Sequence, residues 1–260
     1  MFDVNQHRHD YFYNLATVIG GILPDDLCDT LVARVNNIIA VQGVDWVKHQ
    51  GLGTDAVSEL SGLYNHHIFK GDDIRRYVPE LTAIYHSLVP LISLITHTDT
   101  VVSPYPLSDI NIKVCPAGGG TLGLHYDTNS ITVLLFLTTN QEAPLCMQVE
   151  RHHPSQEKPW IEHRRIFATK GSLLIMQGRK TLHHSEPTVT EQKLSVVYNY
   201  YERHDIYRPK HSTTSLTSAS NRRHWRKARG MQLSKRDLGR GVFDCFPVLC
   251  HHHRWLPGLE

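Results

Sequence analysis

The sequence predicts a mainly β protein of the α+β class, in which an N-terminal helical layer precedes a core of short strands. Two observations support this prediction. Apolar residues recur at helical spacing in the N-terminal part, and from about residue 108 short β-branched and aromatic runs alternate with Gly, Pro and Asn. About six to eight short strands behind a layer of helices are typical of a β-sandwich or a jelly-roll barrel.

Two helices are expected in the N-terminal part. Pro24-Asp25-Asp26 precedes a periodic apolar run that extends to Ile39, which predicts a capped helix of about four turns. A second helix is expected from Gly71 to Leu88. Pro79 and Pro90 should kink or break it, because proline lacks the backbone donor that a helix interior needs.

The strand candidates share a β-branched and aromatic composition and are bounded by turn residues. They are Ile110–Val114, Ser130–Thr138, Leu145–Glu150, Arg164–Thr169, Ser172–Met176 and Leu194–Tyr201. The segment from Ile131 to Leu137 is almost entirely apolar, which predicts a strand that is buried on both faces.

Composition divides the chain into a body and a basic tail. Residues 211–260 hold nine of the 27 Lys and Arg residues but only three of the 25 Asp and Glu residues. We expect a single domain over residues 1–210, with a helical layer over about 1–100 and a jelly-roll core over about 101–207, followed by a poorly ordered tail. The net charge of +2 does not indicate nucleic-acid or membrane binding by the chain as a whole. The basic run 221–229 leaves an oligonucleotide-binding tail as an alternative.

Cysteine usage and the N-terminus bear on the compartment. The five cysteines are scattered and form no Cys-x-x-Cys pair, which favours a reducing environment. The N-terminus lacks the apolar core of a secretory signal, and the stretch from Leu15 to Leu23 is too short for a membrane span. We therefore expect a cytoplasmic protein without a membrane partner.

The first candidate for chemistry is His125-Tyr126-Asp127. Side chains two residues apart on a strand point to the same face, so the imidazole and the carboxylate can bind one metal ion together. Further histidines follow in Leu182-His183-His184. Two histidines and one carboxylate form the facial triad of non-haem Fe(II) sites, whereas structural zinc prefers four ligands that usually include Cys.

A cation follows the second histidine motif. Lys193 is succeeded by a strand that carries Ser195 on the same face. An ammonium group with a hydroxyl beside it suits the distal carboxylate of a dicarboxylate, because lysine binds anions as a point charge.

Together these motifs resemble the 2-oxoglutarate/Fe(II) oxygenase superfamily, over roughly residues 108–202. The superfamily pattern is His-x-Asp, then a His about 50 or more residues later, then Arg or Lys some ten residues after that His. The spacing of His183, Pro187 and Lys193 resembles the prolyl-4-hydroxylase branch. Lys193-x-Ser195 resembles the Arg-x-Ser motif of the isopenicillin-synthase-like branch, with Lys in place of Arg.

The same comparison bears on which histidine binds the metal. Neighbouring residues on a strand face opposite ways, so only one of His183 and His184 can reach it. We favour His183, because it gives both the proline four residues later and the cation ten residues later. The chain departs from the superfamily at Cys115, where Tyr is usual, and at Ala143-Pro144-Leu145, where Gly-Gly is usual.

The resemblance implies a double-stranded β-helix (jelly-roll, cupin-like) core. It implies that His125, Asp127 and His183 are the catalytic ligands of Fe(II) and that Lys193 and Ser195 bind 2-oxoglutarate, with O₂ as the second co-substrate and ascorbate as a candidate supporting reductant. The implied activity is a dioxygenase that hydroxylates an unactivated C–H bond of a small molecule, such as an amino acid or a natural-product intermediate. The alternatives are a peptidyl-prolyl hydroxylase and a jelly-roll metal-binding protein without catalytic activity.

Overall fold

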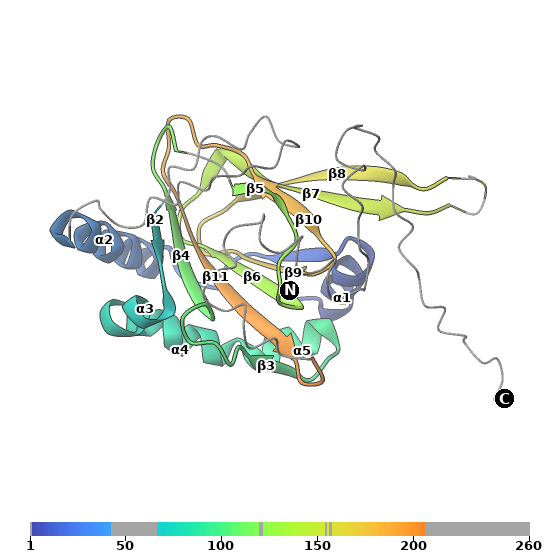
Figure 1. Ribbon diagram of the computed structural model, residues 1–260, viewed down its shortest axis with the longest axis horizontal. Coiled ribbons are helices and arrows are strands. Elements are labelled where there is room, and N and C mark those ends of the chain that lie inside the picture. The colour runs from blue at the N-terminus through green and yellow to red at the C-terminus, as the bar shows by residue number, and fades with distance from the viewer. Residues whose placement is uncertain (1, 43–66, 120–121, 154, 156–157, 206–260) are drawn as a thin grey trace, which may run out of the picture. The chain divides into compact units, whose positions relative to one another are not determined.

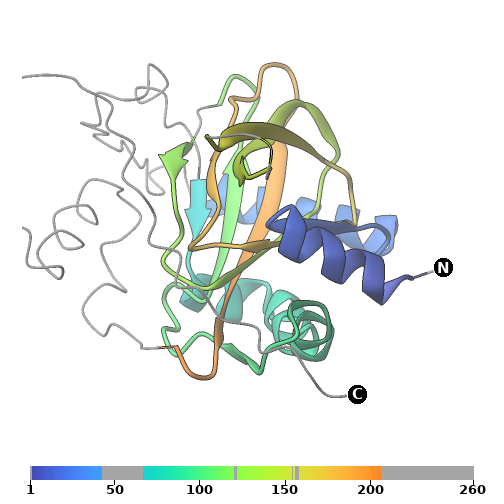
Figure 2. The same cartoon turned by 90° about the vertical axis from the view of Figure 1, so that its right-hand side faces the viewer.

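The computed structural model describes residues 2–42, 67–119, 122–153, 155 and 158–205. The predicted basic tail over 211–260 lies outside the described residues, as does most of the segment that joins the two expected helical regions. Figure 1 shows the helices of the described part beside the larger sheet, with β7 and β8 extending away from them, and Figure 2 shows the same arrangement turned by 90°.

The helices occupy the N-terminal part of the described chain. They are α1 (Val4–Tyr13), α2 (Asp25–Gln42), α3 (Gly71–Tyr77), α4 (Pro79–Ser87) and α5 (Val89–Thr96). Asp3 caps α1, because its carboxylate accepts hydrogen bonds from the backbone N–H groups of Asn5 and Gln6. The predicted second helix is divided into α3, α4 and α5. Pro79 and Pro90 each stand in the first turn of a new helix, where a missing N–H costs nothing.

The strands form a seven-stranded sheet and a four-stranded sheet, and their pairing is antiparallel. The larger sheet has the order β1 (Ala16–Ile19), β9 (Leu173–Gln177), β6 (Ile131–Phe136), β11 (Lys193–Glu202), β4 (Ile110–Cys115) and β2 (His67–Phe69), with β3 (Thr100–Val102) paired to the end of β11. The smaller sheet has the order β5 (Leu122–His125), β10 (Leu182–Ser185), β7 (Asn140–Arg151) and β8 (Trp160–Ala168). All six strands predicted from the sequence are present.

Strands β7 and β8 each begin four or more residues before their predicted starts, β8 at Trp160 rather than Arg164. The sequence predicts Leu145–Glu150, whereas β7 begins at Asn140 and therefore includes Ala143-Pro144-Leu145. Proline cannot donate to a strand ladder, and the pairing of β7 with β8 shifts its register between Asn140 and Leu145. Because of this irregularity, β7 pairs with β8 both before the proline, at Asn140, and after it, from Leu145 onward.

Two apolar clusters lie on the two faces of the larger sheet. On β11, Leu194, Val196 and Tyr198 pack into the cluster that holds the buried faces of the helices, whereas Val197 packs into a second cluster with residues of β7 in the smaller sheet. This alternation follows from the two-residue period of a strand. The helices therefore cover one face of the larger sheet and the smaller sheet covers the other.

Tyrosine hydroxyls tie the helices to this sheet. Tyr198 donates to the carbonyl of Leu81 at 3.2 Å, and Tyr200 donates to the carbonyl of Tyr85 at 2.6 Å. Because both phenols are buried, an unmade bond would leave a desolvated hydroxyl, which costs about 1–3 kcal/mol. These bonds attach β11 to the helices on one face of the sheet. They therefore hold in position the side chains of β11 that point to the smaller sheet.

No single described helix is long and apolar enough to cross a membrane. The stretch Gly71–Tyr77 joined to Pro79–Thr96 meets the length and composition criteria only as a pair that is bent by 112°. Its apolar side chains Ile74, Leu81 and Ile92 are fully buried against the larger sheet.

Candidate metal and co-substrate site

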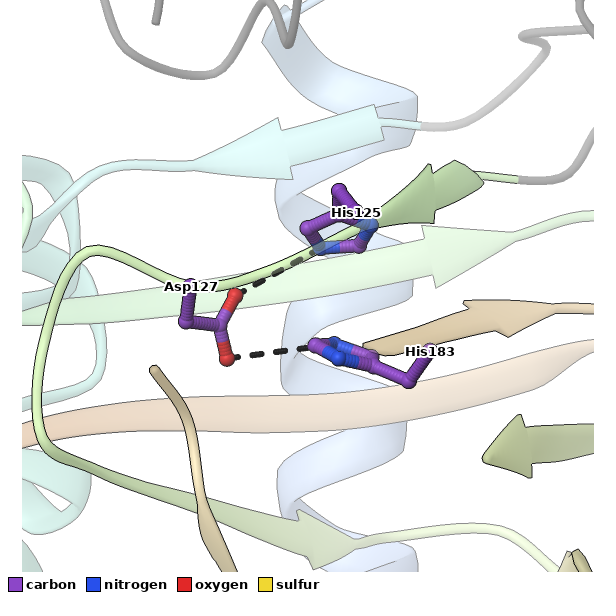
Figure 3. Close-up of side chains that lie close together, drawn as sticks. All are labelled: His125, Asp127 and His183. Atoms are coloured by element: carbon purple, nitrogen blue, oxygen red, sulfur yellow. Dashed lines mark ion pairs between the residues drawn. The ribbon is translucent and has the colours of Figure 1, made fainter. Parts of the chain in front are cut away.

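His125, Asp127 and His183 meet between the two sheets (Figure 3). Nε2 of His125 lies 3.4 Å from Oδ1 of Asp127, and Nε2 of His183 lies 3.8 Å from Oδ2 of the same carboxylate. One donor atom from each residue lies within 4.8 Å of the other two. Two imidazole nitrogens and one carboxylate oxygen at this spacing fit around a single divalent ion.

Strand pairing sets this geometry. His183 on β10 is the register partner of His125 on β5, and the centroids of the two rings are 4.3 Å apart. Asp127 follows the end of β5, where its backbone N–H donates to the carbonyl of Gly178 at 3.1 Å. The predicted histidines are therefore brought together by one ladder, and the turn after β9 fixes the carboxylate beside them.

A second pair of residues orients the Asp127 carboxylate. The hydroxyl of Thr132 on β6 donates to Oδ2 of Asp127 and accepts a hydrogen bond of 2.8 Å from the side-chain amide of Asn129. Sequence reasoning missed Thr132, because it lies inside an apolar run. The feature that could have indicated its role is a polar residue in a strand that is otherwise apolar and is buried throughout.

The protonation states favour metal binding. Nδ1 of His183 lies 3.0 Å from the carbonyl of Thr181, which can only accept, so Nδ1 carries the proton and Nε2 presents its lone pair to the other two donors. Burial, followed by the charge of His125, lowers the pKa of His183 to about 4. Burial alone would raise the pKa of Asp127, but the two histidines and Thr132 hold it well below its usual range. Neutral imidazole and ionised carboxylate are the forms that bind metal.

His184 faces the other side of its strand. It lies with Cys146 and Glu186, whose donor atoms are within 4.8 Å of one another. The Glu186 carboxylate is already paired, since it accepts from Arg165 at 2.8 Å and from the Cys146 thiol at 3.1 Å. The structure thus places His183, and not His184, with His125 and Asp127.

Lys193 lies in the same cavity as the three donors. Its ammonium group donates to the carbonyl of Ala143 at 2.6 Å and to the hydroxyl of Ser185. An ammonium group has three donors, so one donor is left for a ligand. Ser185 was not predicted, although it stands two residues after His183 and therefore shares its face of β10.

Ser195 is 4% exposed and also lines this cavity, as does Cys115, the register partner of Lys193 on β4. The remaining wall is apolar and comes from both sheets. It consists of Leu134, Phe136, Leu145, Met176 and Val197. Sequence reasoning also missed Lys113, a second lysine in this cavity. The feature that could have indicated it is a charged residue within a strand whose other residues are mostly buried.

No family model matches the sequence, and no curated protein matches it either. The structure resembles the non-heme alpha ketoglutarate dependent carbocyclase SnoK from nogalamycin biosynthesis, with a TM-score of 0.59 and 14% identity over 78% of this chain and 86% of that one. It also resembles the epimerase SnoN of the same biosynthesis, with a TM-score of 0.60 and 12% identity over 82% and 87% of the two chains.

A prolyl hydroxylase from Trichoplax adhaerens is similar as well, with a TM-score of 0.53 and 16% identity over 76% of this chain and 89% of that one. The chain has the double-stranded β-helix fold of the 2-oxoglutarate-dependent oxygenases. In this oxygenase fold the two sheets form the core, and the cavity between them holds the three potential metal ligands and both lysines. The predicted fold class is confirmed.

Proposed function

We propose that the protein is an Fe(II)- and 2-oxoglutarate-dependent dioxygenase that acts on a small molecule. One observation carries this proposal. A single cavity contains the donors of His125, Asp127 and His183 and also the ammonium group of Lys193. A metal-binding protein without this co-substrate has no need for a buried cation in the cavity that holds its metal ligands, because burying a charge without a partner is costly.

The donor set fits Fe(II) better than structural zinc. It offers two imidazoles and one carboxylate, with no thiolate among the three donors. These three residues would hold the metal on one side and leave its other positions for ligands. When bound, Fe(II) with 2-oxoglutarate and O₂ supplies the oxidising power for attack on an unactivated C–H bond.

The other residues of the cavity bind, orient and exclude water. Lys193 would hold the outer carboxylate of 2-oxoglutarate with its remaining N–H, and Ser195 on the same strand face would offer a hydroxyl to it. Thr132 keeps the Asp127 carboxylate in one orientation. The apolar wall, which includes Phe136 and Met176, keeps water away from the site.

Similarity to enzymes of natural-product metabolism supports the small-molecule substrate. SnoK and SnoN belong to nogalamycin biosynthesis, and EctD from S. alaskensis, with a TM-score of 0.52 at 11% identity, was solved with 2-oxoglutarate and 5-hydroxyectoine. Hydroxylation is the outcome that we propose, although SnoK and SnoN are a carbocyclase and an epimerase. The second candidate is a prolyl hydroxylase, which the similarity to the Trichoplax adhaerens enzyme supports.

Two measurements test the proposed function. Under anaerobic conditions, Fe(II) plus 2-oxoglutarate should give a weak visible charge-transfer band, which should be absent in Asp127→Ala. In air, with ascorbate present, the wild-type protein should release succinate from 2-oxoglutarate, and a panel of amino acids, natural-product intermediates and prolyl peptides should stimulate that release selectively. Full activity of Asp127→Ala would overturn the assignment, and metal binding without any succinate release would indicate the non-catalytic alternative.

A further inference from the structure

The cavity holds a second lysine, which the proposed function does not use. Lys113 lies on β4, directly opposite Ser195 of β11, while Cys115 of β4 lies opposite Lys193. A strand rises by about 3.4 Å per residue, so the two lysines stand about 7 Å apart along the paired strands. Both side chains line the same cavity as the three potential metal ligands.

In the part of the chain that the structure describes, the ammonium group of Lys113 makes no hydrogen bond and no ion pair, in contrast to that of Lys193. Among the described residues, the only enclosed side-chain polar atom without a hydrogen bond is Oγ1 of Thr82. The nitrogen of Lys113 is therefore not sealed in the wall, and it opens onto the cavity.

The strand register places Lys113 nearer to the metal ligands than Lys193. Thr132, which donates to Asp127, pairs with Asn199 of β11, four residues beyond the partner of Lys113 and six beyond Lys193. Burial lowers the pKa of Lys113, while the Asp127 carboxylate opposes that effect. In turn, the charge of Lys113 contributes to the lowered pKa of His183. Lys193, by contrast, is anchored at Ser185 and Ala143. The two ammonium groups thus have different surroundings within one cavity.

The charges in the cavity do not balance without an anionic ligand. Apart from its histidines and Cys115, the described titratable groups of the cavity are Asp127, Lys113 and Lys193, whose usual charges leave one positive charge in excess before any metal ion is added. A buried ammonium group without a counter-ion is unfavourable by several kcal/mol. A dicarboxylate whose two ends face the two lysines would supply both counter-ions. Cys115, which lies opposite Lys193 on β4, offers only a weak S–H donor.

We propose that Lys113 is a second carboxylate-binding residue, which pairs with the metal-side carboxylate of the bound 2-oxo acid while Lys193 holds the outer carboxylate. This inference rests on the proposed function, because it takes 2-oxoglutarate as the ligand. It assigns one lysine to each end of the co-substrate and makes the recognition of the oxo-acid end independent of Lys193.

Two ligands separate the roles of the lysines. 2-Oxoglutarate has both carboxylates, whereas 2-oxopentanoate keeps the oxo-acid end and lacks the outer carboxylate. Binding of each is measured by isothermal titration calorimetry to the full-length protein loaded with Zn²⁺, which does not support turnover. Lys113→Met should weaken both ligands by the same factor, about tenfold, as expected for a lost charged hydrogen bond. Lys193→Met should weaken 2-oxoglutarate by at least as much and leave 2-oxopentanoate unchanged.

Controls keep the result specific. Lys180→Met changes an exposed lysine and should alter neither affinity. Lys113→Arg keeps the charge and should restore binding of both ligands to within about threefold of wild type. Thermal unfolding checks that each variant is folded, and Lys113→Gln replaces the Met variant if that one does not fold.

The inference is overturned if removal of the Lys113 charge leaves both affinities unchanged, or if it weakens 2-oxoglutarate alone. Failure of the proposed function has a different signature, since the wild-type protein loaded with Zn²⁺ would then bind neither oxo acid.

Discussion

Thr132 donates its hydroxyl proton to Oδ2 of Asp127, across from β6 to the segment after β5. The same hydroxyl accepts from the Asn129 amide at 2.8 Å, so its single proton is committed to the carboxylate. A carboxylate held in this way presents its other oxygen, Oδ1, toward His125 at 3.4 Å. The orientation of the Asp127 carboxylate therefore depends on a residue that is not itself one of the three potential metal ligands.

Replacing Thr132 by Val keeps the shape of the side chain and removes the hydroxyl. We expect Thr132→Val to weaken Fe(II) or Co²⁺ binding by about 10- to 100-fold, because residues that hydrogen-bond to metal ligands contribute this much. Thr132→Ser keeps the hydrogen bond and should stay within a few-fold of wild type. Equilibrium titration with Co²⁺, followed by its visible absorption, measures both, and equal affinities of the Val and Ser variants would show that the hydroxyl does not orient Asp127.

Gly178 packs closely against Asp127 and Thr132, so a larger residue at this position should disturb the position of the Asp127 carboxylate. A Cβ added at this position would lie 2.5 Å from Oγ1 of Thr132, 2.8 Å from the carbonyl oxygen of Asn129 and 3.0 Å from Cβ of Asp127. The backbone of Asn129 cannot move away as a flexible side chain could. We therefore expect Gly178→Ala to displace Asp127 and to lower metal affinity by about tenfold or more.

The change should also destabilise the fold by about 1–3 kcal/mol, the usual effect of overpacking. Metal titration together with urea unfolding checks both effects. Gly20→Ala is a suitable control, because nothing lies within 4 Å of a Cβ at that glycine and its φ is not positive. An unchanged metal affinity in Gly178→Ala would mean that Asp127 does not depend on this turn.

Sequence reasoning succeeded where a local pattern decides the structure. The two-residue period of β11 separates Lys193, Ser195 and Val197 from the helix-facing Leu194 and Val196, and this separation can be read directly from the sequence. The proline positions likewise fix where the second helical region breaks. In both cases the cause acts within a few residues of its effect.

The remaining features depend on contacts between distant segments. The four residues of β1 form a strand because they pair with β9, more than 150 residues later. Thr132, Gly178 and Lys113 each acquire a role only when the second sheet is placed over the first. The helix α1 buries only Tyr11 among its residues, so it has no periodic apolar face that would have predicted it.

His183 and His184 are neighbours with different surroundings, and substitution distinguishes them. His183 is 4% exposed and faces Asp127, whereas His184 lies beside Cys146 and Glu186. We expect His183→Ala to lower Fe(II) affinity by at least about 100-fold, because it removes one of three ligands. His184→Ala should leave that affinity within about threefold of wild type.

Anaerobic Fe(II) titration with the 2-oxoglutarate charge-transfer band as readout compares the two histidine variants. Loss of the band in His184→Ala, with the band retained in His183→Ala, would reverse the assignment of the ligand.

Burial of His183 also predicts how the stability of the metal-free protein depends on pH. Its pKa is lowered to about 4 in the folded state, whereas an unfolded histidine titrates at about 6.5. Between these values the unfolded state binds more protons, so the free energy of unfolding falls as the pH decreases from 6.5 towards 4. At pH 5.5 the loss from this residue is about 1 kcal/mol. Asp127 adds a further loss only at lower pH, since its pKa is held below the usual range.

Urea unfolding of the chelator-treated protein at pH 7.5 and 5.5 measures this contribution. His183→Gln does not titrate at this position, so its loss of stability between the two pH values should be smaller than that of wild type by about 1 kcal/mol. The other histidines are common to both proteins and cancel in the comparison. The same loss of stability in both proteins would mean that His183 titrates in the folded state as it does in the unfolded chain, which contradicts its burial between His125 and Asp127.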